Sequence, residues 1–246
     1  MQMFLFFVVL FSTAFANSTT NSNNSNSLFD GKEFWDDDYL QICDNTTADT
    51  TWQWRKAVCF YYFVSFCTVK IEVVAWSPGL VIYRDLFSKK QVSDYLKLVD
   101  ELNFEEQLVV DDNGTEYFSK VRKANGTHIR AKDYPASLSI LKTVERLMPS
   151  LNFESSEDIV ALSYQRGGHY ATHLDYLEYP SEKEWDGWMR NYGNRFGTLI
   201  MAFESATRGG ATIFPALGAR IKPEPGDAFF WFNAQGDTTQ VILVKN

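Results

Sequence analysis

The chain has 246 residues, 45% of them hydrophobic and 16% aromatic, which is enough apolar material for one well-buried domain of ordinary size. Its 23 basic residues are outnumbered by 31 acidic ones, and the formal net charge is −8 at pH 7. Because contacts to nucleic-acid phosphates need clustered Lys and Arg, this balance excludes a general nucleic-acid-binding function.

The first sixteen residues have the pattern of a secretory signal peptide. An apolar run over residues 4–11 is followed by Ala14-Phe-Ala16, which has the small-x-small form of a cleavage site, although residues 1–3 carry no basic side chain. The apolar run is shorter than the roughly twenty residues that a membrane-spanning helix needs. We therefore expect residues 1–16 to be a cleaved signal peptide and the chain to have no transmembrane anchor.

Five Asn-x-Ser/Thr sequons agree with passage through the secretory pathway, and they begin at Asn17, Asn23, Asn45, Asn113 and Asn125. The first two lie in a tract rich in Ser, Thr and Asn, where sequons arise from composition alone, so the last three are the better evidence. We expect a glycoprotein that resides in the endoplasmic reticulum lumen or is secreted.

Residues 17–56 are polar and have no clear hydrophobic period, which predicts a partly disordered N-terminal segment. An oxidising compartment would permit one disulfide bond among Cys43, Cys59 and Cys67, with one thiol left over. Alternatively, Cys59 and Cys67 are buried small apolar residues. The apolar stretch over residues 57–69 is too short to span a bilayer, which favours a buried strand or helix.

Residues 57–157 are expected to form a supporting region of strands and helices. The pattern predicts strands over residues 71–76 and 80–83, about the turn-forming Ser77-Pro-Gly79. Ser88 is positioned to cap a helix in which apolar residues recur every three or four positions, and a second helix is predicted over residues 136–148. The apolar stripes of these helices are most simply packing faces.

From residue 158 onward the pattern changes to short strands separated by Gly and Pro turns. Strands are predicted over residues 159–164, 169–175, 195–203, 211–214, 219–222 and 228–232. Short strands after a helical half predict an α+β fold, in which a jelly roll (a double-stranded β-helix, cupin-like) is buttressed by N-terminal helices.

One pair of side chains in this region has the spacing of metal ligands. His173 and Asp175 are separated by one residue, so on an extended strand both point to the same face, where they can bind one metal ion. A non-haem Fe(II) oxygenase site uses two histidines and one carboxylate. The other histidines of the chain are His128 and His169, and none follows His173. Two of the three ligands of such a site are therefore visible.

Residues 158–237 resemble the catalytic domain of prolyl 4-hydroxylases, which are Fe(II)- and 2-oxoglutarate-dependent dioxygenases that hydroxylate peptidyl proline in collagen-like chains. Four blocks in order carry the resemblance: Tyr164-Gln-Arg-Gly-Gly-His-Tyr-Ala-Thr-His173-Leu-Asp175, Gly193-Asn-Arg-Phe-Gly-Thr198-Leu, Gly209-Gly-Ala-Thr-Ile-Phe-Pro215 and Pro225-Gly-Asp-Ala-Phe-Phe-Trp231-Phe-Asn233. A weaker likeness extends upstream over residues 77–88. The resemblance implies that residues 158–246 are the dioxygenase jelly-roll core, C-terminally incomplete, of a short member that holds the catalytic domain alone.

The resemblance also implies a role for five residues. It assigns His173 and Asp175 as iron ligands, Tyr164 and Thr198 as contacts of 2-oxoglutarate, and Tyr170 as part of the groove for the substrate proline. The implied cofactors are Fe(II), 2-oxoglutarate, O2 and L-ascorbate. The implied partners are a proline-rich or collagen-like peptide and, as in collagen-type members, protein disulfide isomerase. Without the motif, the residues at 164 and 198 would be interpreted as packing residues of strands.

Two further features of this region have no assigned chemistry. His169 shares strand parity with His173, but its position is variable in the family, so we expect it to be structural or exposed. The segment over residues 176–192, which contains Trp185 and Trp188, is either a mobile lid over the site or a solvated insertion.

The end of the chain departs from the family pattern. In the family, a second iron histidine and then a Lys or Arg that pairs with 2-oxoglutarate follow the block that ends here at Asn233. The chain has no such histidine, Lys245 is not at the matching distance, and spacing does not support Asp237 or Gln240 as replacement ligands. We therefore expect weak metal retention and little turnover.

Two interpretations of function follow from this departure. The first is a proline-hydroxylating dioxygenase of the secretory pathway, represented here by an incomplete or poorly active chain. The second is a catalytically impaired or inactive relative that binds a proline-rich peptide or a partner through the Tyr170 groove. Hydroxylation of lysine or of a small molecule is a third and less favoured possibility.

Overall fold

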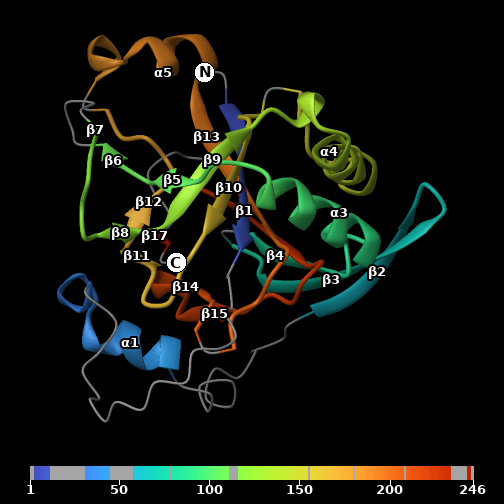
Figure 1. Cartoon of the computed structure of the whole chain (residues 1–246), viewed down its shortest axis with the longest axis horizontal. Helices are drawn as coiled ribbons and strands as arrows, with labels where there is room; N and C mark the ends of the chain where they lie inside the picture. The colour runs from blue at the N-terminus through green and yellow to red at the C-terminus, as the bar shows by residue number, and fades with distance from the viewer. Residues whose placement is uncertain are drawn as a thin grey trace.

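A nine-stranded sheet forms the centre of the molecule (Figure 1). The computed structural model describes residues 3–11, 31–44, 58–77, 79–110, 116–154, 156–179, 181–207, 209–233 and 243–244. In order across the sheet, the strands are β2 (Val58–Val64), β3 (Cys67–Ala75), β4 (Leu80–Arg84), β16 (Ala228–Phe232), β13 (Asn194–Ala202), β1 (Met3–Phe11), β10 (Ile159–Ser163), β9 (Asn125–Ile129) and β5 (Glu105–Glu106).

Eight shorter strands form two-stranded ribbons beside this sheet. The ribbons pair β11 (His169–Tyr170) with β8 (Arg122–Lys123), β12 (His173–Leu174) with β17 (Leu243–Val244), β14 (Thr212–Phe214) with β15 (Ala219–Ile221), and β6 (Val109–Val110) with β7 (Glu116–Tyr117). The strand predicted over residues 169–175 is thus divided between two ribbons, and each part pairs with a different segment.

The helices of the described region are α1 (Asp37–Asp44), α3 (Lys89–Asp100), α4 (Pro135–Leu147) and α5 (Gly187–Tyr192), with 3-10 turns at Lys32–Phe34, Ala131–Asp133, Glu182–Glu184 and Pro215–Leu217. Helix α3 begins at Ser88, whose hydroxyl accepts from the Gln91 amide while the Gln91 side chain accepts from the Ser88 amide, as in a capping box. Helix α4 begins at Pro135, where the missing N–H costs nothing. Both helices agree with the predicted ones.

Alternate residues of the central strands pack into two separate cores, one on each face of the sheet. Leu199 and Met201 of β13 pack into the first core with the buried faces of α3 and α4, whereas Ile200 packs into the second core. Phe214 and Ile221, from the β14–β15 ribbon, cover the second core. The period of two along β13 therefore places α3 and α4 on one face of the sheet and the β14–β15 ribbon on the other (Figure 1).

This layering confirms the α+β fold with a jelly-roll core and supporting helices. Pairs between strands of the large sheet are antiparallel wherever they do not involve β1, and the second layer consists of antiparallel ribbons. The strand predicted over residues 228–232 has the observed bounds of β16. All four residues from Ala228 to Trp231 are buried, because β16 lies within the sheet between β4 and β13.

The first nine described residues lie inside the sheet. Strand β1 pairs in parallel with β13 on one side and with β10 on the other. This segment belongs to the predicted signal peptide over residues 1–16. Nothing in this pairing tests removal of the segment, so the cleavage of residues 1–16 stays a prediction.

Residues 58–69 of the apolar stretch form a hairpin that is largely exposed near its turn, contrary to the expected burial, although Val69 is buried. Strands β2 and β3 are joined by Ser65 and Phe66, both with positive φ, and β2 is the edge of the sheet. Phe63 is 70% exposed and Phe66 is 95% exposed, and β2 has no second strand partner among the described residues. Cys59 is also exposed, and no disulfide bond joins the three cysteines. Neither interpretation of the cysteines therefore holds for Cys59.

The remaining predictions for the N-terminal half are only partly within the described residues. Of the N-terminal segment over residues 17–56, the structure describes only residues 31–44, which contain helix α1. Of the five sequon asparagines, it describes only Asn125, the first residue of β9. None of the described helices has the length and apolar character needed to cross a membrane.

Candidate metal and co-substrate site

His173 presents one ring nitrogen toward Asp175 and anchors the other to the backbone. Its Nδ1 lies 2.8 Å from the carbonyl oxygen of Ala171, and a carbonyl can only accept, so Nδ1 carries the proton. Nε2 faces Asp175, and in the neutral ring this nitrogen carries the lone pair that binds a metal. Strand β12 thus sets both the direction and the tautomer of this imidazole.

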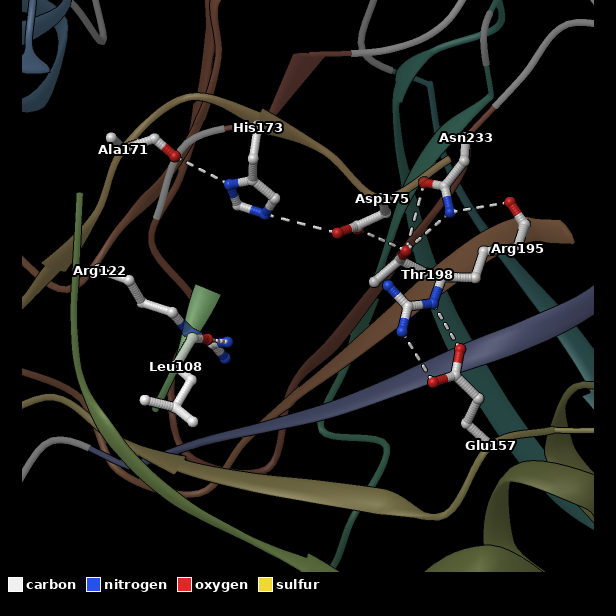
Figure 2. Close-up of polar contacts among 9 residues, drawn as sticks. All are labelled: Leu108, Arg122, Glu157, Ala171, His173, Asp175, Arg195, Thr198 and Asn233. Carbon is white, nitrogen blue, oxygen red and sulfur yellow. Dashed lines mark hydrogen bonds and ion pairs between the residues drawn. The ribbon is translucent and has the colours of Figure 1, made fainter. Parts of the chain in front are cut away.

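Asp175 lies close to Nε2 of His173. Its Oδ1 is 3.4 Å from His173 Nε2, and the residue is 6% exposed (Figure 2). Burial opposes ionisation of this carboxyl, but the contact with His173, the hydroxyl of Thr198 and the charge of Arg195 together hold its pKa below the ordinary value. The carboxylate is therefore available as an anionic candidate ligand.

Thr198 orients the other oxygen of this carboxylate. Its hydroxyl donates to Asp175 Oδ2 over 2.7 Å and accepts from Asn233 Nδ2 over 3.0 Å. Asn233 also donates to the carbonyl oxygen of Arg195 over 3.2 Å. Strands β13 and β16 pair in register beside these residues, which brings the second and fourth sequence blocks to the first (Figure 2).

Tyr170 stacks on His173, the candidate ligand. The ring centroids of Tyr170 and His173 are 3.7 Å apart with an interplanar angle of 16°, and the guanidinium carbon of Arg122 lies 4.7 Å from the centroid of the Tyr170 ring. Burial raises the pKa of the Tyr170 phenol, so the ring is neutral. An aromatic surface therefore adjoins the two candidate ligands.

Two buried polar atoms near this surface make no hydrogen bond within the described residues. They are the hydroxyl of Tyr164 and Nε of Arg122. Burial raises the pKa of Tyr164, and the charge of Arg122 acts on it in the opposite direction, which shows that the two groups are close. Buried groups of this kind are usually paired, so the two are suited to a polar ligand.

Arg195 brings a second cation to the site from β13. Its Nε and terminal nitrogen donate to the two carboxylate oxygens of Glu157 over 2.6 and 2.9 Å. Its charge also acts on Asp175 and Tyr170. Arg195 and Asn233 were not predicted as site residues, although both lie in the sequence blocks that carry the family resemblance. Arg122 lies outside those blocks, and only the fold places it at the site.

His169 is structural, in agreement with the prediction, and it is buried. Its Nε2 lies 2.7 Å from the carbonyl oxygen of Lys120, and its Nδ1 lies 3.3 Å from that of Gly167. Gly31 packs so closely on the ring that an added Cβ would lie 1.9 Å from Nε2. The segment over residues 176–192 contains α5, and Asn194 bonds both backbone polar groups of Leu177 at its base.

The two candidate ligands fit one Fe(II) ion in chemistry and in direction, but the third protein donor is missing from the described part of the chain. Residue Val244 of β17 stands opposite His173 in the ribbon, and valine cannot bind a metal. No group of three or more His, Cys, Asp and Glu side chains converges among the described residues. Asp237, Gln240 and Lys245 lie outside them.

Comparisons with known proteins agree with the sequence blocks. The prolyl 4-hydroxylase subunit alpha-2 of Caenorhabditis elegans is 22% identical over 206 residues, which cover 82% of this chain and 38% of that protein. Probable prolyl 4-hydroxylase 10 of Arabidopsis thaliana is 27% identical over 195 residues, which cover 69% of this chain and 63% of that protein. The chain thus spans less than two thirds of the length of either relative.

Among solved structures, the viral collagen prolyl hydroxylase of Paramecium bursaria Chlorella virus-1, a 2OG complex, aligns with a TM-score of 0.47 and 17% identity over 68% of this chain and 87% of that one. No family model matches the chain. The curated relatives confirm the resemblance stated from the four blocks: the chain is a distant homologue of prolyl 4-hydroxylases.

Proposed function

We propose that this chain is a dioxygenase domain that binds Fe(II) and 2-oxoglutarate and hydroxylates proline in a peptide. The observation that carries the proposal is the prepared pair of ligands: His173 has its Nδ1 proton engaged by a backbone carbonyl, and Asp175 has one oxygen held by Thr198. This arrangement leaves His173 Nε2 and Asp175 Oδ1 directed at one point, 3.4 Å apart.

The neighbouring polar groups are suited to 2-oxoglutarate. The unpaired hydroxyl of Tyr164 and the unpaired Nε of Arg122 can each donate to a carboxylate, and the guanidinium supplies the positive charge that the family takes from a later Lys or Arg. The hydroxyl of Thr198 donates its hydrogen bond to Asp175, and we propose that it also contacts 2-oxoglutarate.

When bound, Fe(II) would supply oxygen activation, in which one atom of O2 enters the substrate and the other enters succinate as 2-oxoglutarate loses CO2.

The substrate surface is the ring of Tyr170. A stacked aromatic beside the ligands can hold the apolar face of a pyrrolidine ring close to the metal position. A proline-rich or collagen-like peptide is the proposed substrate, with L-ascorbate as reductant and protein disulfide isomerase as a partner. The sequons and the apolar leader support an endoplasmic reticulum or secreted location, which is part of the same proposal.

The test combines metal binding with turnover. Co(II) binding to the purified chain, followed by visible absorption, is expected to be lost in His173→Ala and kept in His128→Ala, because His128 lies on β9, away from the site. Fe(II)-dependent conversion of 2-oxoglutarate to succinate is then measured with and without a proline-rich peptide. Unchanged Co(II) binding in His173→Ala would refute the ligand assignment.

A second candidate function is a binding module that does not turn over, and it is favoured by one observation: the position opposite His173 is Val244. With two protein ligands, water must complete the coordination, and metal affinity falls. Binding of the proline-rich peptide without added Fe(II), together with no peptide-stimulated succinate formation, would support this function over the first.

A further inference from the structure

The hairpin of β2 and β3 projects from one edge of the large sheet, and its outer strand is apolar throughout (Figure 1). Strand β2 reads Val-Cys-Phe-Tyr-Tyr-Phe-Val over residues 58–64, and its only strand partner among the described residues is β3. Edge strands of soluble proteins are normally protected by charged residues, proline or bulges. Strand β2 has no charge and no proline, and its register with β3 has no bulge. The opposite edge strand, β5, consists of Glu105 and Glu106 and is protected by charge.

The free edge of β2 presents the backbone groups of alternate residues. The turn of the hairpin is Ser65-Phe66, and both residues have positive φ, as in a two-residue type I′ turn. Val64 and Cys67 flank this turn and form its closing hydrogen-bonded pair, so every second residue before Val64 also directs its N–H and C=O to β3. The odd-numbered residues then direct their N–H and C=O away from β3, and these are Cys59, Tyr61 and Phe63. A strand edge of this kind is a template for one further strand.

The side chains of the hairpin expose enough apolar surface for an interface between two proteins. Tyr61 and Phe63 are each 70% exposed, and Phe66 at the turn is 95% exposed. Val58 and Phe60 are each 38% exposed. Because one aromatic side chain presents about 150–250 Å², the five residues together expose on the order of 600 Å². Two copies of this surface reach about 1,200 Å², which is the lower end of the range for specific, stable protein–protein interfaces.

The sequence of β2 is complementary to its own reverse, as a two-fold symmetric contact between copies requires. Antiparallel pairing of two β2 strands about Tyr61 opposes the following residues: Val58 and Val64, Cys59 and Phe63, Phe60 and Tyr62. Every pair is apolar or aromatic, so no like charges meet, although the chain has a net charge of −8. In this register odd-numbered residues stand opposite odd-numbered residues. The outward N–H and C=O groups of both strands therefore find partners in each other.

We propose that β2 is a homodimer interface, at which a second copy of this chain adds its own β2 antiparallel to the first, about a two-fold axis at Tyr61. The two nine-stranded sheets then form one continuous sheet across the axis. A lipid surface would also cover exposed aromatic side chains, but it offers no partners to the outward N–H and C=O groups, whereas a second strand does. The interface contains none of the candidate site residues, so it does not depend on the proposed function.

Sedimentation velocity of the full-length chain over a concentration series tests the association. We expect a reversible dimer with twice the mass of the 28.3 kDa chain. Tyr61→Lys places two like charges opposite each other at the two-fold axis and should raise the dimer dissociation constant roughly tenfold or more. The Tm of the variant should change little, because Tyr61 is 70% exposed. Trp76→Lys is the matched control, since Trp76 is also 70% exposed but lies outside β2, and it should dimerise like the parent.

Cysteine cross-linking tests the register of the two strands. In a Cys59→Ser background, Tyr61→Cys places a thiol opposite its own copy, and mild oxidation should link the two chains. Phe63→Cys in the same background is the control, because its copy lies four residues away along the pair, at roughly 13 Å, beyond the reach of a disulfide.

Three results would overturn the proposal: a monomer at every concentration, parent-like dimerisation of Tyr61→Lys, or equal cross-linking at positions 61 and 63. A monomer that binds phosphatidylcholine vesicles would assign this surface to a membrane instead. These readouts need neither Fe(II) nor 2-oxoglutarate, so a failure of the proposed function would not affect them.

Discussion

The hydroxyl of Thr198 donates a 2.7 Å hydrogen bond to Asp175, and this buried contact joins two segments 23 residues apart. It ties the direction of a candidate metal ligand to the central sheet, since Thr198 lies on β13. Asp175 has no freedom to turn away unless this bond breaks.

Replacement of Thr198 by valine is expected to weaken metal binding by roughly 10- to 100-fold, the usual effect of losing a residue that orients a metal ligand. The loss also leaves Asp175 and Asn233 short of a partner, which costs about 1–3 kcal/mol of stability. Co(II) titration at a temperature well below the Tm measures the first effect, and urea unfolding measures the second. Thr198→Ser is the control and should bind Co(II) like the parent. Parent-like Co(II) affinity in Thr198→Val would contradict the orienting role.

Introduction of histidine at position 244 is expected to strengthen metal binding. Directly opposed residues of an antiparallel pair share one face, so Val244→His would add an imidazole on the face of His173 and complete a set of two histidines and one carboxylate. Leu243→His is the matched control, because Leu243 stands opposite Leu174 on the other face. Equal Co(II) affinities of the two variants would show that β12 does not present His173 beside β17 as described.

Loss of the positive charge at Arg122 is expected to weaken binding of 2-oxoglutarate. A charge-assisted hydrogen bond contributes about 1.5–3 kcal/mol, which corresponds to roughly 10- to 100-fold in affinity. Arg122→Gln should therefore show this loss in a binding titration with 2-oxoglutarate in the presence of Co(II), whereas Lys123→Gln, at the exposed neighbour on β8, should not. An unchanged affinity in Arg122→Gln would assign the co-substrate to another cation, of which Arg195 is the next candidate.

Substitution of Gly31 by alanine tests the contact that holds the N-terminal segment against the site. The added Cβ would lie 1.9 Å from His169 Nε2 and would displace the ring from the carbonyl of Lys120. Because the φ of Gly31 is −102°, the cost is steric, about 1–3 kcal/mol in urea unfolding. Gly187→Ala is the control, since nothing lies within 4 Å of its added Cβ, and it should stay within about 0.5 kcal/mol of the parent. A parent-like Gly31→Ala would contradict the packing of Gly31 on the ring of His169.

Local sequence patterns were sufficient for several elements and for the shared direction of His173 and Asp175. Helix α3 follows from the Ser88 cap and apolar residues at helical spacing, and β16 follows from an apolar run between turn residues. The spacing of His173 and Asp175 predicted a shared face, because side-chain direction along an extended segment depends only on parity. The four blocks predicted the relationship to prolyl 4-hydroxylases.

Other features depend on contacts between segments far apart in the chain, and only the tertiary structure decided them. An apolar run such as residues 3–11 has the same composition whether it is a leader or a central strand, and its partners are more than 140 residues away, at β10 and β13. The hairpin of β2 and β3 is equally apolar but lies at the edge of the sheet, where its rings are exposed. Val244 stands opposite His173, and Arg122 lies beside Tyr170, because of pairing registers that no local pattern specifies. The physical reason is the same in each case: parity and period determine which way a side chain points, whereas the neighbour it meets depends on which strands the whole chain brings together.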